Sequence, residues 1–179
     1  MRYLEAEADG MADGELPDWD RIVERHAKRV FRVAVRILGC VEDAEDVSQD
    51  VFTEAFRLHK VGPVQSWPGL LVRLATLRSI DRLRRNRPSE ELRESDRMSI
   101  VEPFDQVAAA ELAQWLRNSM AQLPDQQAAV FVMFHFEQLS RDQISATLGV
   151  SPEAVSTTLY KARQRLLTRL AVFNQGDPK

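Results

Sequence analysis

Side chains that could bind or react gather in three separate stretches of this sequence. From Glu42 to Glu54 the charged side chains are all acidic, and from Arg73 to Arg87 they are all arginines apart from one aspartate. Hydroxyl groups predominate from Ser151 to Thr158. Such a separation of carboxylates, guanidinium groups and hydroxyls is typical of a protein whose different surfaces recognise different partners.

The acidic stretch raises the hypothesis of an enzyme, since clustered carboxylates can hold a metal ion. The Glu-x-x-His pattern is absent, however, and the three histidines, His26, His59 and His135, are far apart. The sequence also lacks a P-loop, a glycine-rich dinucleotide turn and a nucleophile elbow. We therefore expect a protein without catalytic activity, metal or cofactor.

The composition is that of a globular helical protein. Of the 179 residues, 44% are hydrophobic and 28% are charged, and glycine and proline are few. No apolar run approaches the roughly 20 residues that a membrane span needs. The acidic N-terminus has no apolar segment of the kind that a signal peptide requires. The single cysteine, Cys40, cannot form an internal disulfide, which fits a reducing cytoplasm.

The expected architecture is all-α, with two small helical domains joined by a linker. Residues 1–16 are acidic and have little to bury, so we expect a disordered tail. Helical periodicity covers residues 17–87 and 105–173. Residues 88–104 between them are polar and of mixed charge, which is typical of an interdomain linker. The C-terminal domain is expected to contain a helix-turn-helix.

Helices are expected in the first domain from Pro17 to Leu38 and from Glu42 to about His59, with a third capped by Ser66. In the second of these helices the apolar residues form one stripe and polar residues face the other way. The outward residues are Asp46, Gln49, Asp50 and Thr53. This acidic face has two interpretations: a solvated face that offsets the helix dipole, or a docking surface for a basic partner.

The third helix is predicted to bury one stripe of leucines, and Asp81 falls on the same stripe. The stripe consists of Leu70, Leu74 and Leu77. A buried carboxylate needs a partner, which the first helix offers in Arg29, Arg32 or Arg36. The arginines of the third helix are expected to face outward beside Trp67. They form either a solvated face or a contact for a nucleic-acid backbone with aromatic stacking.

In the second domain we expect helices over about 105–123 and 124–137. Ser140 and Gln143 then have the spacing of a capping box, and the helix that they open ends at Gly149. Ser151 and Pro152 start the last helix. This arrangement is typical of a DNA-reading unit whose second helix enters the major groove, or of an ordinary helical hairpin with a solvated face. The outward residues of the last helix are Glu153, Thr157, Tyr160, Lys161 and Gln164, with Ser156 and Thr158 beside them.

Three blocks of this sequence resemble the extracytoplasmic-function (ECF) group of bacterial RNA polymerase sigma factors. They are EDAEDVSQDVFTEAF (42–56), SWPGLLVRLATLRSIDRLRR (66–85) and LPDQQAAVFVMFHFEQLSRDQISATLGVSPEAVSTTLYKARQRL (123–166). The third block alone is also similar to response-regulator output domains, but the three blocks in this order are highly specific. The resemblance covers about Trp19 to Leu170 and implies a promoter-specificity subunit without catalysis of its own.

The resemblance implies a partner for each block. The acidic helix would dock on the clamp helices of the largest subunit of core RNA polymerase, with the polymerase flap as a further contact. The implied docking residues are Asp46, Gln49, Asp50 and Thr53. The arginine-rich helix and the loop before it, Lys60 to Gln65, would melt and read the minus-ten promoter element. The implied residues are Lys60, Trp67, Arg73, Arg78, Arg82, Arg84 and Arg85. The C-terminal hairpin would read the minus-thirty-five element as duplex DNA. Its implied residues are Ser151, Glu153, Ser156, Thr157, Thr158, Lys161 and Arg163.

Some positions depart from the family pattern. Thr76 and Leu77 stand where the family usually has Arg and Asn, so the minus-ten contacts of that Asn are not expected here. Ser156 and Thr158 replace basic residues, which implies weaker and less salt-sensitive duplex binding. The alternative function is a stand-alone helix-turn-helix regulator, which leaves the acidic and arginine-rich helices unexplained. By resemblance, an anti-sigma protein that masks both domains is a further partner.

Overall fold

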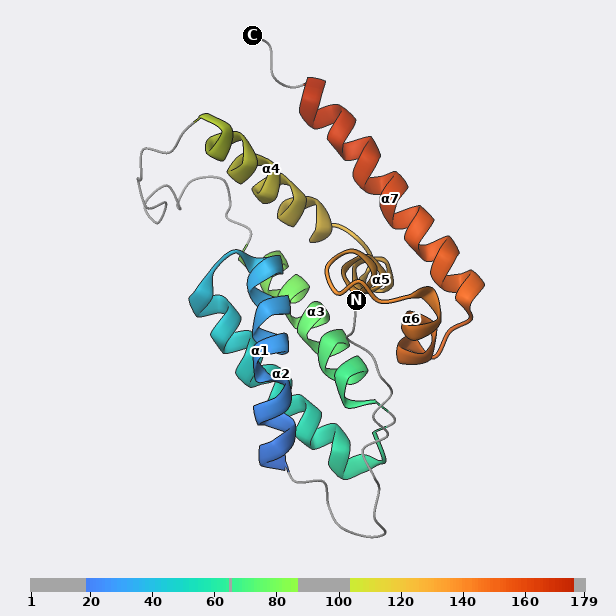
Figure 1. Ribbon diagram of the computed structural model, residues 1–179. Coiled ribbons are helices and arrows are strands. Elements are labelled where there is room, and N and C mark those ends of the chain that lie inside the picture. The colour runs from blue at the N-terminus through green and yellow to red at the C-terminus, as the bar shows by residue number, and fades with distance from the viewer. Residues whose placement is uncertain (1–18, 65, 87–103, 176–179) are drawn as a thin grey trace.

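The computed structural model describes residues 19–64, 66–86 and 104–175, and within these ranges its regular structure is entirely helical (Figure 1). The helices are α1 (Trp19–Leu38), α2 (Val41–Val61), α3 (Trp67–Arg85), α4 (Phe104–Met120), α5 (Asp125–His135), α6 (Arg141–Leu148) and α7 (Pro152–Gln175). The all-α prediction is confirmed. The expected tail, and all but the last residue of the expected linker, lie outside the described residues.

Several helices begin and end where local sequence rules place their boundaries. α1 ends where Gly39 adopts a left-handed conformation with φ +72°, and Gly149 does the same after α6 with φ +66°. The Ser66 side chain accepts a hydrogen bond from a first-turn amide of α3. Ser140 and Gln143 form both hydrogen bonds of the capping box at the start of α6. The predicted caps and stops are therefore confirmed.

Helices α1, α2 and α3 pack on one another. The stripe predicted for α2 consists of Ala44, Val47, Val51, Ala55 and Leu58, and α2 buries all of these except Leu58. The buried stripe ends at Ala55, because Leu58 near the end of α2 is 42% exposed.

The buried face of α3 is broader than the predicted stripe and is rotated from it. Leu70, Leu77 and Asp81 are only half-buried. The buried residues are Gly69, Leu71, Val72, Leu74, Ala75, Thr76, Ser79 and Ile80. The reason is that α3 contacts α1 and α2 and also α5 and α6. A helix with neighbours on several sides does not show one amphipathic stripe.

Helices α4 to α7 form the second group, in which α5 is the core helix. α5 buries Ala128, Ala129, Val130, Val132 and Met133. α7 packs on α5 and buries Val155, Leu159, Ala162 and Leu166.

The two groups of helices share one hydrophobic core. A single cluster of buried side chains runs from Val33 in α1 through Ile80 in α3 to Met133 in α5 and Leu159 in α7. Figure 1 shows α5 lying beside α3. α3 also approaches α6 closely, since a Cβ added at Gly69 would lie 2.9 Å from Oγ1 of Thr147.

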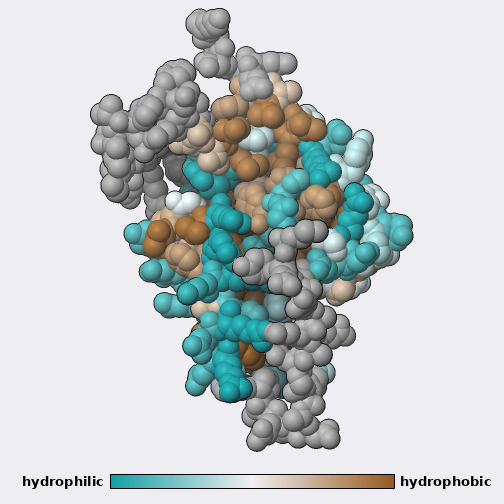
Figure 2. Space-filling model, in the orientation of Figure 1, coloured by the Kyte–Doolittle hydropathy of each residue, from teal (hydrophilic) through white to brown (hydrophobic). Residues whose placement is uncertain are grey.

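Apolar surface gathers over α4 and the C-terminal end of α7 (Figure 2). Leu112 is 50% exposed and Val172 is 68% exposed. Phe173 is exposed and lies against Trp115, with ring centroids 5.9 Å apart. In the part of the chain that the structure describes, no helix is long and apolar enough to cross a membrane.

Candidate nucleic-acid interface

The acidic face of α2 lies on the surface. Asp46, Gln49, Asp50 and Thr53 are all exposed, on the side opposite the buried stripe. The Asp46 side chain is 62% exposed although it accepts a hydrogen bond from Arg82 at 3.1 Å. The face therefore presents two carboxylates and two neutral polar groups, which suits a basic partner.

Two arginines of α3 pair with α2 instead of lying free. Arg82 donates from Nε and Nη2 to Asp43 at 2.9 and 2.6 Å, and Asn86 donates to the other oxygen of Asp43 at 2.8 Å. Arg78 donates to Glu54 at 2.7 Å. The bond to Asp43 raises the pKa of Arg82 and so favours the charged guanidinium. These pairs tie α2 to α3, so Arg78 and Arg82, which we expected to face outward, lie at the surface but are paired with carboxylates of α2.

Arg73 and Arg85 have the outward arrangement that the sequence predicts. Both are exposed. Among the described residues, neither takes part in a hydrogen bond or an ion pair. They are therefore the α3 arginines best placed for an external phosphate.

Arg84 reaches across to the turn between α4 and α5. It donates to the carbonyl of Ala121 at 2.9 Å and to that of Leu123 at 2.7 Å, and it pairs with Asp125 at 2.7 Å. Its contact with Asp81 is longer, at 3.4 Å. Arg84 is thus occupied by the second helix group. It is also the partner of Asp81, which we predicted to come from α1.

The arginines of α1 hold the far end of α5. Arg29 Nε lies 2.8 Å from Oε2 of Glu137, whose side chain is 6% exposed. Arg36 Nη1 donates to the carbonyl of Phe136 at 2.8 Å. The prediction that Arg29, Arg32 or Arg36 neutralises Asp81 is therefore wrong, and two of these arginines join the two helix groups instead.

Trp67 lies in an aromatic cluster where α2 ends and α3 begins. Its ring centroid is 5.7 Å from that of Trp19 and 5.4 Å from that of His59. Trp19 also contacts Phe56, with centroids 5.0 Å apart, and Lys60 Nζ lies 4.3 Å from the Phe56 centroid. Trp67 is half-buried. Packing therefore fixes the orientation of Trp67, and the Phe56 ring orients Lys60.

A groove of about 410 Å³ lies between the segment that joins α2 to α3 and α6. Val61, which is 87% exposed, and Leu70 contribute apolar side chains to one wall. Ala146 and Thr147 of α6 contribute to the other wall. The groove is thus built from both helix groups.

The C-terminal hairpin has the geometry of a helix-turn-helix. At the start of α7, the Ser151 side chain accepts a hydrogen bond from the amide of Ala154 at 3.2 Å. The pKa of Glu153 lies below its usual value, because its own backbone amide and the Ser151 hydroxyl hydrogen-bond to the carboxylate. Ser156 donates to the carbonyl of Pro152 at 3.0 Å. The first turn of α7 is therefore rigidly capped.

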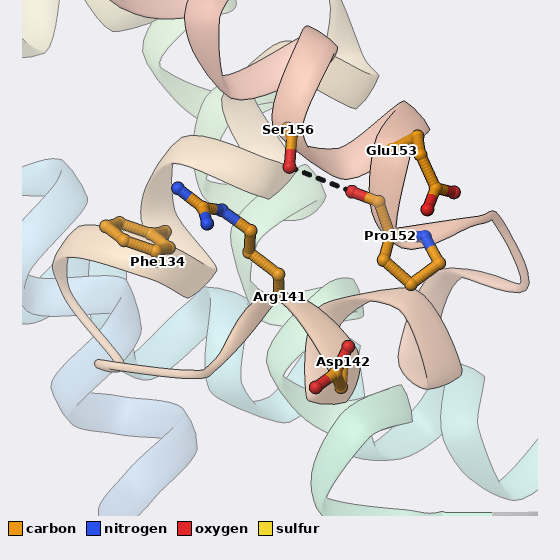
Figure 3. Close-up of a pocket in the computed structure, with 6 residues that line it drawn as sticks. All are labelled: Phe134, Arg141, Asp142, Pro152, Glu153 and Ser156. Carbon is orange, nitrogen blue, oxygen red and sulfur yellow. Dashed lines mark hydrogen bonds between the residues drawn. The ribbon is translucent and has the colours of Figure 1, made fainter.

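The outer face of α7 is polar, as predicted. Thr157, Tyr160, Lys161 and Gln164 are exposed, whereas Thr158 is half-buried. An open hollow of about 540 Å³ lies beside this face (Figure 3). Its lining residues are Phe134, Arg141, Asp142, Pro152, Glu153 and Ser156. The first turns of α6 and α7 therefore open onto the same surface, where DNA could meet both.

Arg163 is less free than its place in the sequence predicts. Its Nε donates to Nε2 of His135 at 3.2 Å, and its Cζ lies 5.2 Å from the ring centroid of Phe134. We predicted a DNA contact for Arg163 but no role for His135. A histidine in an aromatic run was the only signal in the sequence for this pair. Within the described residues, no group of three or more His, Cys, Asp or Glu side chains could hold a metal ion.

Comparisons with known proteins agree with this geometry. The models of "Sigma-70 region 2" and "Sigma-70, region 4" match residues 22–89 and 113–166. The ECF RNA polymerase sigma factor SigE of Mycolicibacterium smegmatis is 33% identical over 168 residues, which cover 87% of this chain and 63% of SigE. SigW of Bacillus subtilis, an ECF sigma factor, is 26% identical over 162 residues, which cover 83% of this chain and 87% of SigW.

A solved structure shows the same fold. The sigma factor RpoE of Bartonella quintana, in complex with the anti-sigma factor NepR, has a TM-score of 0.51 at 18% identity, over 88% of this chain and 99% of that one. Both sigma regions occur here in order, and the relatives named as ECF sigma factors align with most of the chain. The chain therefore belongs to the sigma-70 family of RNA polymerase sigma factors and, within it, to the ECF group.

Proposed function

We propose that this protein is a sigma factor that binds core RNA polymerase, directs it to promoters, melts the DNA there and so starts transcription. It performs no catalysis of its own. One observation carries the proposal: a single chain holds both sigma regions in order and presents an exposed acidic helix face, exposed arginines and a capped helix-turn-helix.

Two surfaces are proposed to bind polymerase. The acidic face of α2, formed by Asp46, Gln49, Asp50 and Thr53, docks on the clamp helices of the largest subunit. Its exposure and charge support this assignment. The apolar surface over α4 and the end of α7, which includes Leu112 and Phe173, docks on the flap. Exposed apolar patches of this kind mark interaction sites.

The minus-ten element is proposed to bind along α3 and the segment before it. Arg73 and Arg85 make the backbone contacts, because they are exposed and unpaired among the described residues. Lys60 and Trp67 contribute from the aromatic cluster. Arg78 and Arg82 chiefly hold α3 against α2, and Arg84 contributes once it leaves α5. Melting costs about 1–2 kcal/mol per base step, which contacts with the extruded strand offset.

The minus-thirty-five element is proposed to bind α7 as duplex. Thr157 and Lys161 are exposed on the outer face. The rigid first turn holds Ser151, Glu153 and Ser156 at the groove edge, and Arg163 reaches a phosphate. Thr158, which is half-buried, lies at the margin of this contact. Phosphate contacts from Lys and Arg then supply affinity, and side chains at base edges supply sequence preference.

We further propose that the protein acts in the cytoplasm, where bacterial core polymerase is found, and that an anti-sigma protein regulates it. The likeness to RpoE, which was solved with the anti-sigma factor NepR, supports such a partner. The proposed domains remain residues 17–87 and 105–173, joined by residues 88–104. The alternative of a stand-alone regulator does not use the acidic face.

Run-off transcription on fragments of the source genome tests the proposed function. Core polymerase with the protein should yield transcripts that core polymerase alone does not. The protein should also co-purify with core polymerase. If no new transcript appears and the two do not associate, the proposal is wrong.

A charge reversal tests the docking face. Asp46→Arg with Asp50→Arg should reduce the affinity for core polymerase by about 100-fold or more, since like charges across an interface cost several kcal/mol. Glu24→Arg on α1, also exposed, is the matched control and should keep its affinity. Circular dichroism should show the same helix content in both variants. Undiminished binding by the double variant would mean that the acidic face is only solvated.

A further inference from the structure

In the cluster where α5 ends against α7, His135 has no assigned role in the proposed function. The His135 ring packs at a tilt against Phe131 and edge-on against Phe134, with centroids 4.6 and 5.1 Å away. Arg163 of α7 donates its Nε–H to His135 Nε2 at 3.2 Å and lies over the Phe134 ring. One hydrogen bond and one cation–π contact therefore orient this guanidinium.

The bond depends on the protonation state of His135. Arginine only donates, so His135 must accept with an unprotonated Nε2. Burial, and then the charge of Arg163, lower the pKa of His135 below its usual value, so the imidazole is neutral at pH 7. A proton on His135 removes the acceptor and places two cations side by side.

Arg163 is also placed to meet DNA. Ser156 and Arg163 are seven residues apart, which is close to two full turns, so they lie on one line along α7. Ser156 and Phe134 line the hollow in Figure 3, and Arg163 lies over the Phe134 ring. The two Nη groups of Arg163 have no hydrogen bond to any described residue. They are therefore available to an anion on this surface.

We propose that His135 is a positioning residue, which holds Arg163 so that its Nη groups bind one backbone phosphate of duplex DNA. His135 itself does not touch the DNA. The proposal rests on the proposed function, since it adds a residue to the minus-thirty-five contact. The planar fork of a guanidinium matches a phosphate only in the right orientation, and a side chain that is held beforehand loses less entropy on binding.

Other charged side chains come from the elements packed around this turn. Glu137 is paired with Arg29, and Arg36 is bound to the carbonyl of Phe136. Arg84 of α3 is engaged with Asp125 at the opposite end of α5, and Arg141 and Asp142 of α6 line the hollow. None of these charges contributes to the lowered pKa of His135, whereas the charge of Arg163 does. A pH response of this contact is therefore assigned to the His135–Arg163 pair.

The test measures duplex affinity of the full chain, alone and bound to core polymerase. The probe is a duplex that each wild-type preparation selects from a random-sequence library. His135→Phe keeps the aromatic packing but removes the acceptor. His135→Gln supplies an amide oxygen that accepts without titrating. Arg163→Gln, alone and combined with His135→Phe, completes a double-mutant cycle.

At pH 7.5 the His135→Phe variant should bind the duplex about tenfold more weakly than wild type. This is close to the smallest effect expected from the loss of one hydrogen bond to a charged group. The glutamine variant should stay within about twofold of wild type. As the pH falls to 5.5, the wild type should weaken relative to the glutamine variant. His135→Phe should add almost nothing to Arg163→Gln. A purely structural role would show neither rescue by glutamine nor a pH response.

Wild-type affinity in His135→Phe, or losses that simply add in the double variant, would overturn the proposal. A different result is expected if the proposed sigma-factor function is wrong. In that case the chain with core polymerase would select no duplex beyond those that it selects alone, and the variants would still be compared on that duplex. If neither preparation selects any duplex, both proposals are wrong.

Discussion

Replacing Arg29 by Met should destabilise the protein by about 3 kcal/mol. The Glu137 side chain is 6% exposed and the Arg29 side chain 23% exposed, with 2.8 Å between Nε of Arg29 and Oε2 of Glu137. Removing one partner of a buried ion pair costs about 3–5 kcal/mol, because the other charge is left uncompensated. The partial exposure of Arg29 places the loss at the lower end. For a chain of this size that corresponds to a melting temperature lower by about 6–12 °C.

Urea unfolding followed by circular dichroism at pH 7 measures this loss. Two controls separate the pair from its surroundings. Arg29→Met with Glu137→Leu should recover most of the stability, since an apolar pair of similar volume replaces a buried ion pair at little cost. Arg73→Met, on the exposed face of α3, should change the free energy of unfolding by less than about 0.5 kcal/mol.

The reasoning is refuted if Arg29→Met unfolds at the wild-type urea concentration. It is also refuted if the double variant is less stable than Arg29→Met, because then the carboxylate alone is not what destabilises the single variant. Unfolding should remain one cooperative transition in all variants, since the two helix groups share a core.

Three further predictions concern single positions. Gly149→Ala should cost about 1 kcal/mol, because φ is +66°. Gly149→Asn should cost less. Since no atom lies within 4 Å of the added Cβ, a much larger loss in urea would contradict strain as the cause. Gly69→Ala should lower the melting temperature despite the helix propensity of Ala, because its Cβ would lie 2.9 Å from Thr147 Oγ1. Adding Thr147→Ala should restore it, and an unchanged single variant would disprove the close approach. The pKa of His135 is lower in the folded protein than its value of 6.5 in the unfolded chain. The free energy of unfolding should therefore be highest above pH 6.5 and should decrease as the pH falls from 6.5 toward the folded pKa. His135→Gln should lack this step, so equal pH dependence of the melting temperature would contradict it.

The sequence was a good guide to local structure. Ser140, Gln143 and Gly149 are capping residues whose effect reaches only a few residues along the chain, and they act as predicted. The outward face of α2 was also predictable, because this helix is buried along one stripe only. In such cases the period of the sequence and the environment of the helix coincide.

Long-range partners were not predictable in this way. Arg84 and Asp125 are 41 residues apart, and Arg29 and Glu137 are 108 apart. An arginine donates equally well to DNA phosphates, carboxylates and carbonyl groups, so composition alone does not choose between them. The sequence did not predict the broad buried face of α3 for the same reason. Besides α1 and α2, α3 packs on α5, which is distant in the sequence and belongs to the other helix group.

Under the proposed function, the shared core limits how far apart the two DNA-binding surfaces of the molecule can lie. The names of the two elements place them about 25 base pairs apart, or about 85 Å along a duplex that rises 3.4 Å per pair. In this structure, by contrast, α3 packs directly on α5 and α7 packs on α5 as well, with Arg84 2.7 Å from Asp125. The helices α3 and α7 are only about 29 Å and about 36 Å long. A chain that reads both elements at once must therefore separate α3 from α5 and expose the buried cluster between them. The free energy of that separation is a threshold that binding to polymerase and promoter has to exceed.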